Sequence, residues 1–207
     1  MSTALATWLI GMSLGGVSLV LLALAFDAWR LKMTPTPSGR RARRHLIALC
    51  AREICHVEKT SLPQVFDLGS GWGGLCLGVG RALNRERARC DVIGYELGRV
   101  PHGVSRASLA LLRLVYRCLN KNPLYLARCN LRRGDLIDAL AEVREGDVCL
   151  CYLCPEQMQR IADELDTTPQ DLGITLISLV FALPRHTPHT LERLSGVFKD
   201  PIYVYKV

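Results

Sequence analysis

Four glycines within six positions, directly after a short apolar run, constrain the fold of this chain more than any other feature. The stretch at residues 65–74 reads VFDLGSGWGG, and residues 75–83 then carry apolar side chains at helical spacing. Glycine adopts positive φ at little cost and lets the backbone approach its neighbours closely, so a strand can turn sharply here into a helix. The stretch therefore predicts a strand, a glycine turn and a helix.

The rest of the chain alternates in the same way between short apolar runs and longer helical patterns. We expect further strands at residues 91–96, 124–129, 147–153, 174–181 and 201–207. We expect further helices at residues 103–119, just after 135, and at 156–165. Near-continuous apolar strands separated by helices are typical of a parallel sheet covered on both faces. We predict an α/β protein with a doubly wound, mostly parallel sheet over residues 60–207.

The N-terminal region carries a second strong signal, because 23 consecutive residues from Ala4 to Phe26 have no charge. At roughly 1.5 Å per residue such a helix is about 34 Å long, and a bilayer's hydrocarbon core is about 30 Å thick. A signal peptide would need preceding basic residues and a cleavage site, which we do not find. A buried helix of a soluble protein is the other alternative. We predict one transmembrane anchor within residues 1–29.

The segment that follows, residues 30–59, is strongly basic. It holds eight Lys and Arg residues against two Glu residues, which accounts for +6 of the chain's net charge of +7. By the positive-inside rule, the part after Trp29 faces the cytosol, or the mitochondrial matrix in a eukaryote. Beside a membrane span, anionic lipid headgroups are a better partner for this segment than nucleic acid. Within it, residues 40–58 have the spacing of a helix that packs on the domain.

Two further patterns bear on partners and metals. Gly11 and Gly15 have the spacing that lets transmembrane helices pack closely, which would allow a homodimer. The nine cysteines are odd in number and lie mostly in apolar contexts, as is typical of reduced, buried thiols. Cys151 and Cys154 form a single CxxC with no second pair, so we predict no metal site.

Three acidic residues accompany the glycine turn, each at the end of an expected strand. A carboxylate at Asp67 would repel a pyrophosphate but bind an ammonium group, which favours S-adenosylmethionine over NAD. Glu96 would accept hydrogen bonds from both ribose hydroxyls of either cofactor. Asp135 would accept one from the adenine amino group. The predicted cofactor-binding residues are Asp67, Gly69, Ser70, Gly71, Gly73, Glu96 and Asp135.

The pattern Asp67-x-Gly69-x-Gly71-x-Gly73, together with Glu96 and Asp135, resembles the class I, seven-strand S-adenosylmethionine-dependent methyltransferases. The resemblance covers about residues 60–207. It implies a Rossmann-like fold, with S-adenosylmethionine as the cofactor.

A narrower resemblance adds an expected substrate class. The segments that carry it are GYE at 94–96, YLCPEQM at 152–158 and FALP at 181–184. They are similar to the membrane-anchored lysine methyltransferases of the mitochondrial ADP/ATP carrier and the ATP synthase c-subunit, and to their prokaryotic relatives. Those enzymes also have one hydrophobic helix before the catalytic domain. The non-SET histone H3 lysine methyltransferase has a similar core.

The residues after the fourth expected strand depart from the wider amino-methylating families. Where those families have Asn/Asp-Pro-Pro-aromatic, this chain has Leu153-Cys154-Pro155-Glu156. We expect Tyr152 and the backbone of Cys154 and Pro155 to shape the channel of the methyl acceptor. Glu156 would attract an incoming ammonium group, or would simply begin a helix after proline.

The sequence therefore predicts a membrane-anchored methyltransferase that uses S-adenosylmethionine and modifies a lysine of a membrane-associated protein. Two alternatives stay open, namely a methyltransferase of a lipid or another membrane-soluble acceptor, and a non-catalytic nucleoside-binding module. An NAD-dependent oxidoreductase is a more distant alternative.

Overall fold

The computed structural model describes residues 3–31, 39–56, 62–86, 89–121, 126, 128–168, 172–194 and 200–207. Its helices are α1 (Thr3–Leu31), α2 (Arg40–His56), α3 (Gly74–Arg85), α4 (Arg99–Cys118), α6 (Leu136–Leu140) and α7 (Pro155–Thr167). Its strands are β1 (Gln64–Leu68), β2 (Asp91–Glu96), β3 (Cys129–Arg133), β4 (Val148–Cys151), β5 (Thr175–Leu179), β6 (Thr190–Arg193) and β7 (Pro201–Lys206).

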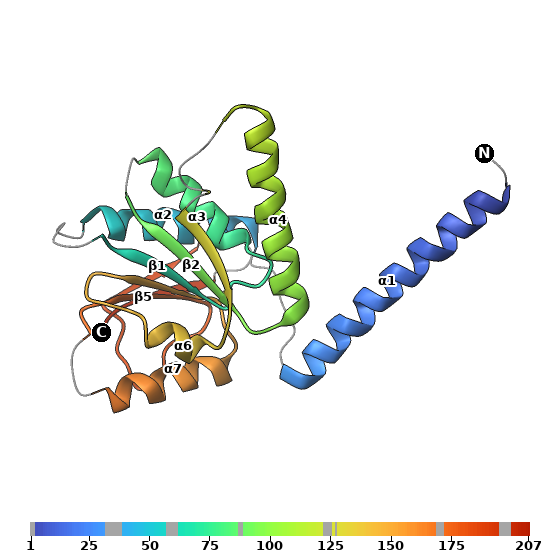
Figure 1. Ribbon diagram of the computed structural model, residues 1–207. Coiled ribbons are helices and arrows are strands. Elements are labelled where there is room, and N and C mark those ends of the chain that lie inside the picture. Colours follow the sequence, from blue (N-terminus) through green and yellow to red (C-terminus); the bar gives the residue numbers. More distant parts are fainter. Residues whose placement is uncertain are drawn as a thin grey trace.

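The strands form one mixed sheet in the order β3-β2-β1-β4-β5-β7-β6. Strands β1 to β5 run parallel, and β7 lies antiparallel between β5 and β6. In Figure 1, α2, α3 and α4 cover one face of this sheet, and α6 and α7 cover the other. The prediction of a doubly wound, mostly parallel α/β sheet is confirmed.

Alternating side chains of the buried strands supply two cores, one on each face of the sheet. In β1, Val65 packs with residues of α2 and α3, whereas Phe66 and Leu68 pack with residues of α6 and α7. Both sets are almost fully buried, as expected for a strand covered on both faces. Because the parallel strands run in the same direction, the loops that follow them lie together at the carboxyl ends of the strands. This is where ligands bind in open α/β folds.

Two strands differ from the sequence prediction. We expected the third strand at 124–129, but β3 begins at Cys129, which pairs with Val92, and ends at Arg133 beside Glu96. The apolar pattern before Cys129 suits a helix as well as a strand, and residues 126 and 128 are helical. Strand β6 was not predicted, because it has only four residues, alternately half-buried and exposed, at the edge of the sheet.

The N-terminal helix α1 extends away from the sheet domain in Figure 1. Its last turns pack against α4, and Asp27 there is buried. The predicted transmembrane helix is not confirmed, since no helix among the residues described with their side chains is long and apolar enough to cross a bilayer. Much of the predicted span, 4–26, lies outside those residues. The predicted helix at 40–58 is confirmed over residues 40–56 as α2, which buries Leu46, Cys50 and Ile54 against the domain, and residues 57 and 58 lie outside the described residues.

Candidate functional site

The glycine turn between β1 and α3 is held by the end of β2. The backbone N–H groups of Gly69 and Ser70 both donate to the carbonyl oxygen of Tyr95, at 3.0 and 2.8 Å. Gly69, Gly71 and Gly73 have φ values of 95°, 52° and 77°. Residues with a side chain rarely adopt this left-handed conformation, so the glycines make this tight course of the backbone possible.

Neighbouring elements approach the turn so closely that they leave little room for larger residues. A Cβ on Gly94 of β2 would lie 2.8 Å from the Cβ of Ser70, and one on Gly69 would lie 2.5 Å from a methyl of Leu153. Neither Leu153 nor Gly94 has a role predicted from the sequence beyond the family resemblance. A glycine inside an otherwise apolar strand often marks a place where another backbone approaches closely. This pattern could have identified Gly94 from the sequence.

Asp67, at the carboxyl end of β1, is 2% exposed. No described residue gives its Oδ2 atom a hydrogen bond, and the same holds for the buried Oγ of Ser70. Burial, and next the nearby carboxylate of Glu96, raise the pKa of Asp67 to about 7, while the backbone N–H of Cys76 acts in the opposite direction. A buried carboxyl with an unpaired oxygen is costly unless a ligand completes it.

Glu96 ends β2 as predicted and has both of its oxygens engaged by backbone groups. Gly71 donates to Oε2 at 2.8 Å, and Gly98 donates to Oε1 at 2.7 Å. Glu96 thus joins the glycine turn to the loop before α4. Burial is the largest cause that raises its pKa, and the charge of Asp27 adds to the effect.

Asp135 lies two residues after the end of β3 and has partners of its own. It caps α6 by accepting the backbone N–H of Ile137 at 3.0 Å. Arg160 of α7 donates to both of its oxygens, at 2.9 and 3.1 Å. The three acids therefore differ, because Asp67 has an unpaired oxygen whereas both oxygens of Asp135 are engaged.

The residues after β4 lead from the sheet into α7. Tyr152 is half-buried on the same face of the sheet as Leu150, the cross-strand partner of Asp67. Cys154 is the N-cap of α7 and Pro155 its first residue. Glu156 lies in the first turn, with Oε2 at 3.6 Å from the thiol of Cys154. The interpretation of Glu156 as a helix-start residue is confirmed, and its role toward an acceptor stays a prediction.

The loop after β5 lies beside this segment, since Cys151 and Ser178 are partners in parallel strands. The loop starts at Val180, whose φ of 75° is unusual for a β-branched residue. The hydroxyl of Ser178 donates to the carbonyl oxygen of Phe181 at 2.6 Å, and Phe181 is 37% exposed. An aromatic side chain is thus presented on a constrained backbone near the end of β4.

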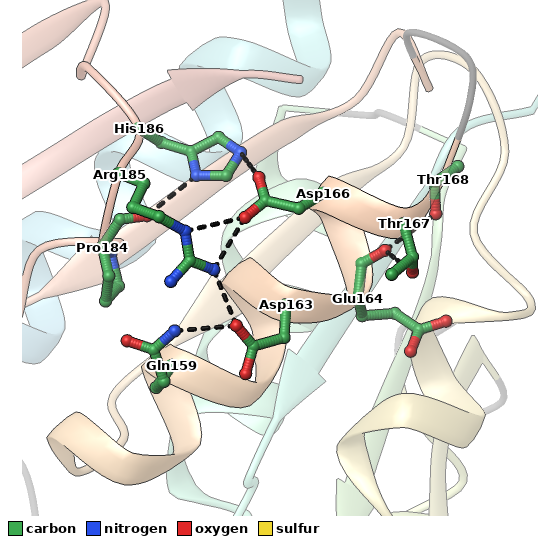
Figure 2. Close-up of polar contacts among 9 residues, drawn as sticks. All are labelled: Gln159, Asp163, Glu164, Asp166, Thr167, Thr168, Pro184, Arg185 and His186. Atoms are coloured by element: carbon green, nitrogen blue, oxygen red, sulfur yellow. Dashed lines mark hydrogen bonds and ion pairs between the residues drawn. The ribbon is translucent and has the colours of Figure 1, made fainter.

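A polar network fastens the far end of this loop to α7 (Figure 2). Arg185, at φ 63°, donates to Asp163 at 2.7 Å and to Asp166 at 2.8 Å. His186 lies 3.7 Å from Asp166, and its Nδ1 donates to the carbonyl oxygen of Pro184 at 2.9 Å. Exposed ion pairs contribute little stability individually, so the effect of this network is mainly to fix the position of the loop.

The end of α1 reaches the site, which the sequence analysis did not predict. Oδ2 of Asp27 accepts the backbone N–H of Val100 at 3.0 Å, at the start of α4. The loop that carries Glu96 and Gly98 immediately precedes this contact.

No group of His, Cys, Asp or Glu suited to a metal occurs among the described residues. The nine cysteines are all free thiols, and six of them are buried. Burial raises the pKa of Cys149 and Cys151 strongly, so these thiols stay protonated.

The fold is shared with solved methyltransferase structures. The human methyltransferase 10 domain containing protein is 12% identical, with a TM-score of 0.56 over 90% of this chain and 93% of that one. The rRNA methyltransferase aviRa from Streptomyces viridochromogenes is 16% identical, with a TM-score of 0.54 over 83% and 86%. The N-terminal domain of human METTL16 in complex with SAH is 12% identical, with a TM-score of 0.52 over 82% and 70%.

These likenesses establish that the chain has the fold of these methyltransferases. The sequence matches no family model and no curated protein.

Proposed function

We propose that this protein is a membrane-anchored S-adenosylmethionine-dependent methyltransferase that acts on a lysine of a membrane-associated protein. The observation that carries the proposal is the buried, unpaired carboxylate oxygen of Asp67 next to the glycine turn. It lies in a fold of which one solved example, from human METTL16, holds SAH.

The residues at the strand ends fit this cofactor. Asp67 suits the ammonium of a methionine moiety, because a cation would offset the cost of burying its charge. Glu96 keeps free lone pairs for ribose hydroxyls after accepting one backbone N–H on each oxygen. Asp135 would have to share its oxygens between Arg160 and adenine, so we assign it the weakest contact of the three.

When bound, S-adenosylmethionine supplies a methyl group on a positively charged sulfur. The protein's task is mainly to align the acceptor, so proximity and orientation dominate the catalysis. We assign that task to Tyr152 and the backbone of Cys154 and Pro155, which follow β4 at the same edge of the sheet as Asp67. A lysine ammonium, with a pKa of about 10.4 in water, must lose a proton before it attacks, and burial beside Tyr152 would promote that loss.

The sequence supports the membrane anchor and its orientation. The uncharged run from Ala4 to Phe26 lies within a single helix, α1, and the basic residues of 30–59 follow it. We propose that the catalytic domain lies on the cytosolic or matrix side, with the basic segment at anionic lipid headgroups. Tethering to the bilayer raises the local concentration of an acceptor in the same membrane.

The decisive experiment incubates the full-length protein with membranes and S-adenosylmethionine carrying a labelled methyl group. Glu96→Ala tests the site, and Asp91→Ala is the matched control, because Asp91 is an exposed acid at the opposite end of the same strand. We expect label in protein with the wild type and with Asp91→Ala. We expect at least about a hundredfold less with Glu96→Ala. Mass spectrometry of the labelled protein should place one or more methyl groups on lysine.

Other outcomes would reject parts of the proposal. Label confined to the lipid fraction would exclude a protein lysine as the acceptor. Binding of the cofactor without transfer to any membrane component would favour a non-catalytic nucleoside-binding module.

A further inference from the structure

Helix α4 has apolar side chains on a face that no described element covers. Five large residues line this face and are between 43% and 60% exposed: Val104, Leu111, Leu114 and Val115 of α4, and Leu119 at its C-cap. The buried face of the same helix is a different one and includes His102, Ser105 and Leu109. The spacings 104–111–115 and 111–115–119 place the exposed residues along one stripe, which we call the α4 stripe.

The start of α4 lies beside the end of α1, where further apolar side chains are exposed. Val100, one turn before Val104, is the residue whose N–H is bonded to Asp27 of α1. Phe26 and Trp29, one residue before and two residues after Asp27, are 53% and 77% exposed, and their ring centroids lie 6.0 Å apart. Exposed apolar side chains therefore lie on both helices close to this contact, and they are more numerous than the single exposed residues that are normal on soluble domains.

Basic residues border this surface, and helix α4 contains no acidic residue. Arg99, Arg106 and Arg117 are exposed and follow one another at intervals of two and three helical turns, along one side of the stripe. An apolar face with Leu and Val, bordered by arginines, is typical of a helix that lies in the interface of an anionic bilayer. Tryptophan is also enriched at the membrane interface, and Trp29 is an exposed tryptophan near the start of α4.

We propose that the α4 stripe lies on an anionic lipid surface and holds the domain against the membrane. This contact is separate from the one assigned to residues 30–59, and it does not depend on methyltransferase activity. Because α4 begins directly after the loop of Glu96 and Gly98, the contact brings the edge of the sheet that carries the site close to the lipid. A catalytic domain in this position would favour a methyl acceptor that lies near the lipid headgroups.

The chain's own cysteines provide the probe. Cys118 lies on α4 beside the stripe, and Cys55 lies on α2; both are exposed. In full-length protein with Cys154→Ser, a second change, Cys55→Ser or Cys118→Ser, leaves one accessible thiol for an environment-sensitive nitrobenzoxadiazole label. Each labelled protein is reconstituted into vesicles of phosphatidylcholine with phosphatidylglycerol, with and without a lipid-attached quencher. We expect the lipid-attached quencher to reduce the fluorescence of the label at Cys118 several-fold. The label at Cys55, which lies within the basic segment assigned to the headgroups, is the positive control for contact with the vesicle.

Matched variants test the stripe itself. Leu111→Glu should remove most of the quenching at Cys118, because it places a charge in the apolar face. Leu191→Glu changes another exposed leucine, 47% exposed on β6, and should leave the quenching unchanged. Vesicles of phosphatidylcholine alone should weaken the quenching, because the arginines lose their anionic partners.

Three results would overturn the proposal. The first is quenching of the label at Cys55 without quenching of the label at Cys118. The second is quenching that Leu111→Glu does not change while circular dichroism shows an intact fold. The third is protection of Cys118 that depends on protein concentration and appears with Cys118–Cys118 cross-links, which would assign the stripe to a second copy of the chain.

Discussion

Asp67 is the residue whose chemistry depends most on the surrounding fold. Its side chain is buried at the end of β1, with Glu96 as a second nearby carboxylate. An exposed aspartate is ionised at neutral pH, whereas a pKa of about 7 leaves Asp67 near half-protonation. The ionisation of this residue therefore links cofactor binding to pH.

We predict that the affinity for S-adenosylmethionine rises between pH 6 and pH 8, because the cofactor's ammonium prefers the ionised carboxylate. Binding at pH 6 should release a proton, which calorimetry detects in buffers of different ionisation enthalpy. Asp67→Asn should bind weakly and release none. An affinity independent of pH over this range would contradict the assignment of Asp67.

The same residue affects the stability of the unliganded protein in the opposite direction. Between about pH 4 and pH 7 the folded state keeps a proton on Asp67 that the unfolded chain has lost, so this residue lowers the stability as the pH rises. We predict that Asp67→Asn stabilises the unliganded protein at pH 8 by roughly 1–3 kcal/mol. Denaturant unfolding at pH 5 and pH 8 measures this difference, which should be smaller at pH 5.

Asp27 couples the N-terminal helix to the site through one hydrogen bond to Val100. We predict that Asp27→Ala weakens cofactor binding several-fold, because the loop of Glu96 and Gly98 loses its fixed neighbour, while Asp27→Asn keeps an acceptor oxygen and most of the affinity. Asp147→Ala is the control. Asp147 also accepts backbone N–H groups, from Gln64 and Arg144, but at the start of β1, away from the glycine turn. A similar loss of affinity in both alanine variants would assign the effect to stability alone.

At the scale of elements, the glycine turn depends on how closely β2 approaches it. A Cβ on Gly94 would lie 2.8 Å from Ser70 and 2.9 Å from Leu131, too close to be accommodated without displacement. We predict that Gly94→Ala destabilises the protein by about 1–3 kcal/mol and weakens cofactor binding at least tenfold or so.

The control for Gly94→Ala is Gly103→Ala in α4. A Cβ on Gly103 would meet no atom within 4 Å, and the helix interior favours alanine over glycine. This variant should be more stable by about 0.5–1 kcal/mol, with unchanged cofactor affinity. Thermal unfolding and calorimetry of the two variants compare a glycine that the site requires with one that it does not.

At the scale of the whole molecule, a ligand that binds only the folded state raises its stability by mass action. At a concentration a hundred times its dissociation constant, S-adenosylmethionine should stabilise the protein by about 2.7 kcal/mol, seen as a higher melting temperature. NAD at the same concentration should have no such effect, and neither cofactor should stabilise Glu96→Ala. Stabilisation by NAD alone would support the oxidoreductase alternative.

The local pattern of the sequence determined much of this protein. The apolar runs around Val65, Val92 and Leu150 predict buried parallel strands. The length of each apolar run predicts where its strand ends, and this places Asp67 and Glu96 at strand ends. The apolar pattern did not predict the element correctly where it was short, or where it suited a helix and a strand equally well. Strand β6 has only four residues, alternately half-buried and exposed, and the pattern before Cys129 suits a helix as well as a strand.

Only the tertiary structure decided which groups meet. Asp27 and Val100 are 73 positions apart, and the contact of Leu153 with the glycine turn depends on how β4 lies beside β1. Periodicity reports which face of an element is apolar, but not which element covers it. For that reason the sequence marked the acids of the site, whereas the partners of Asp135 and the uncovered stripe on α4 could be known only once the elements had packed.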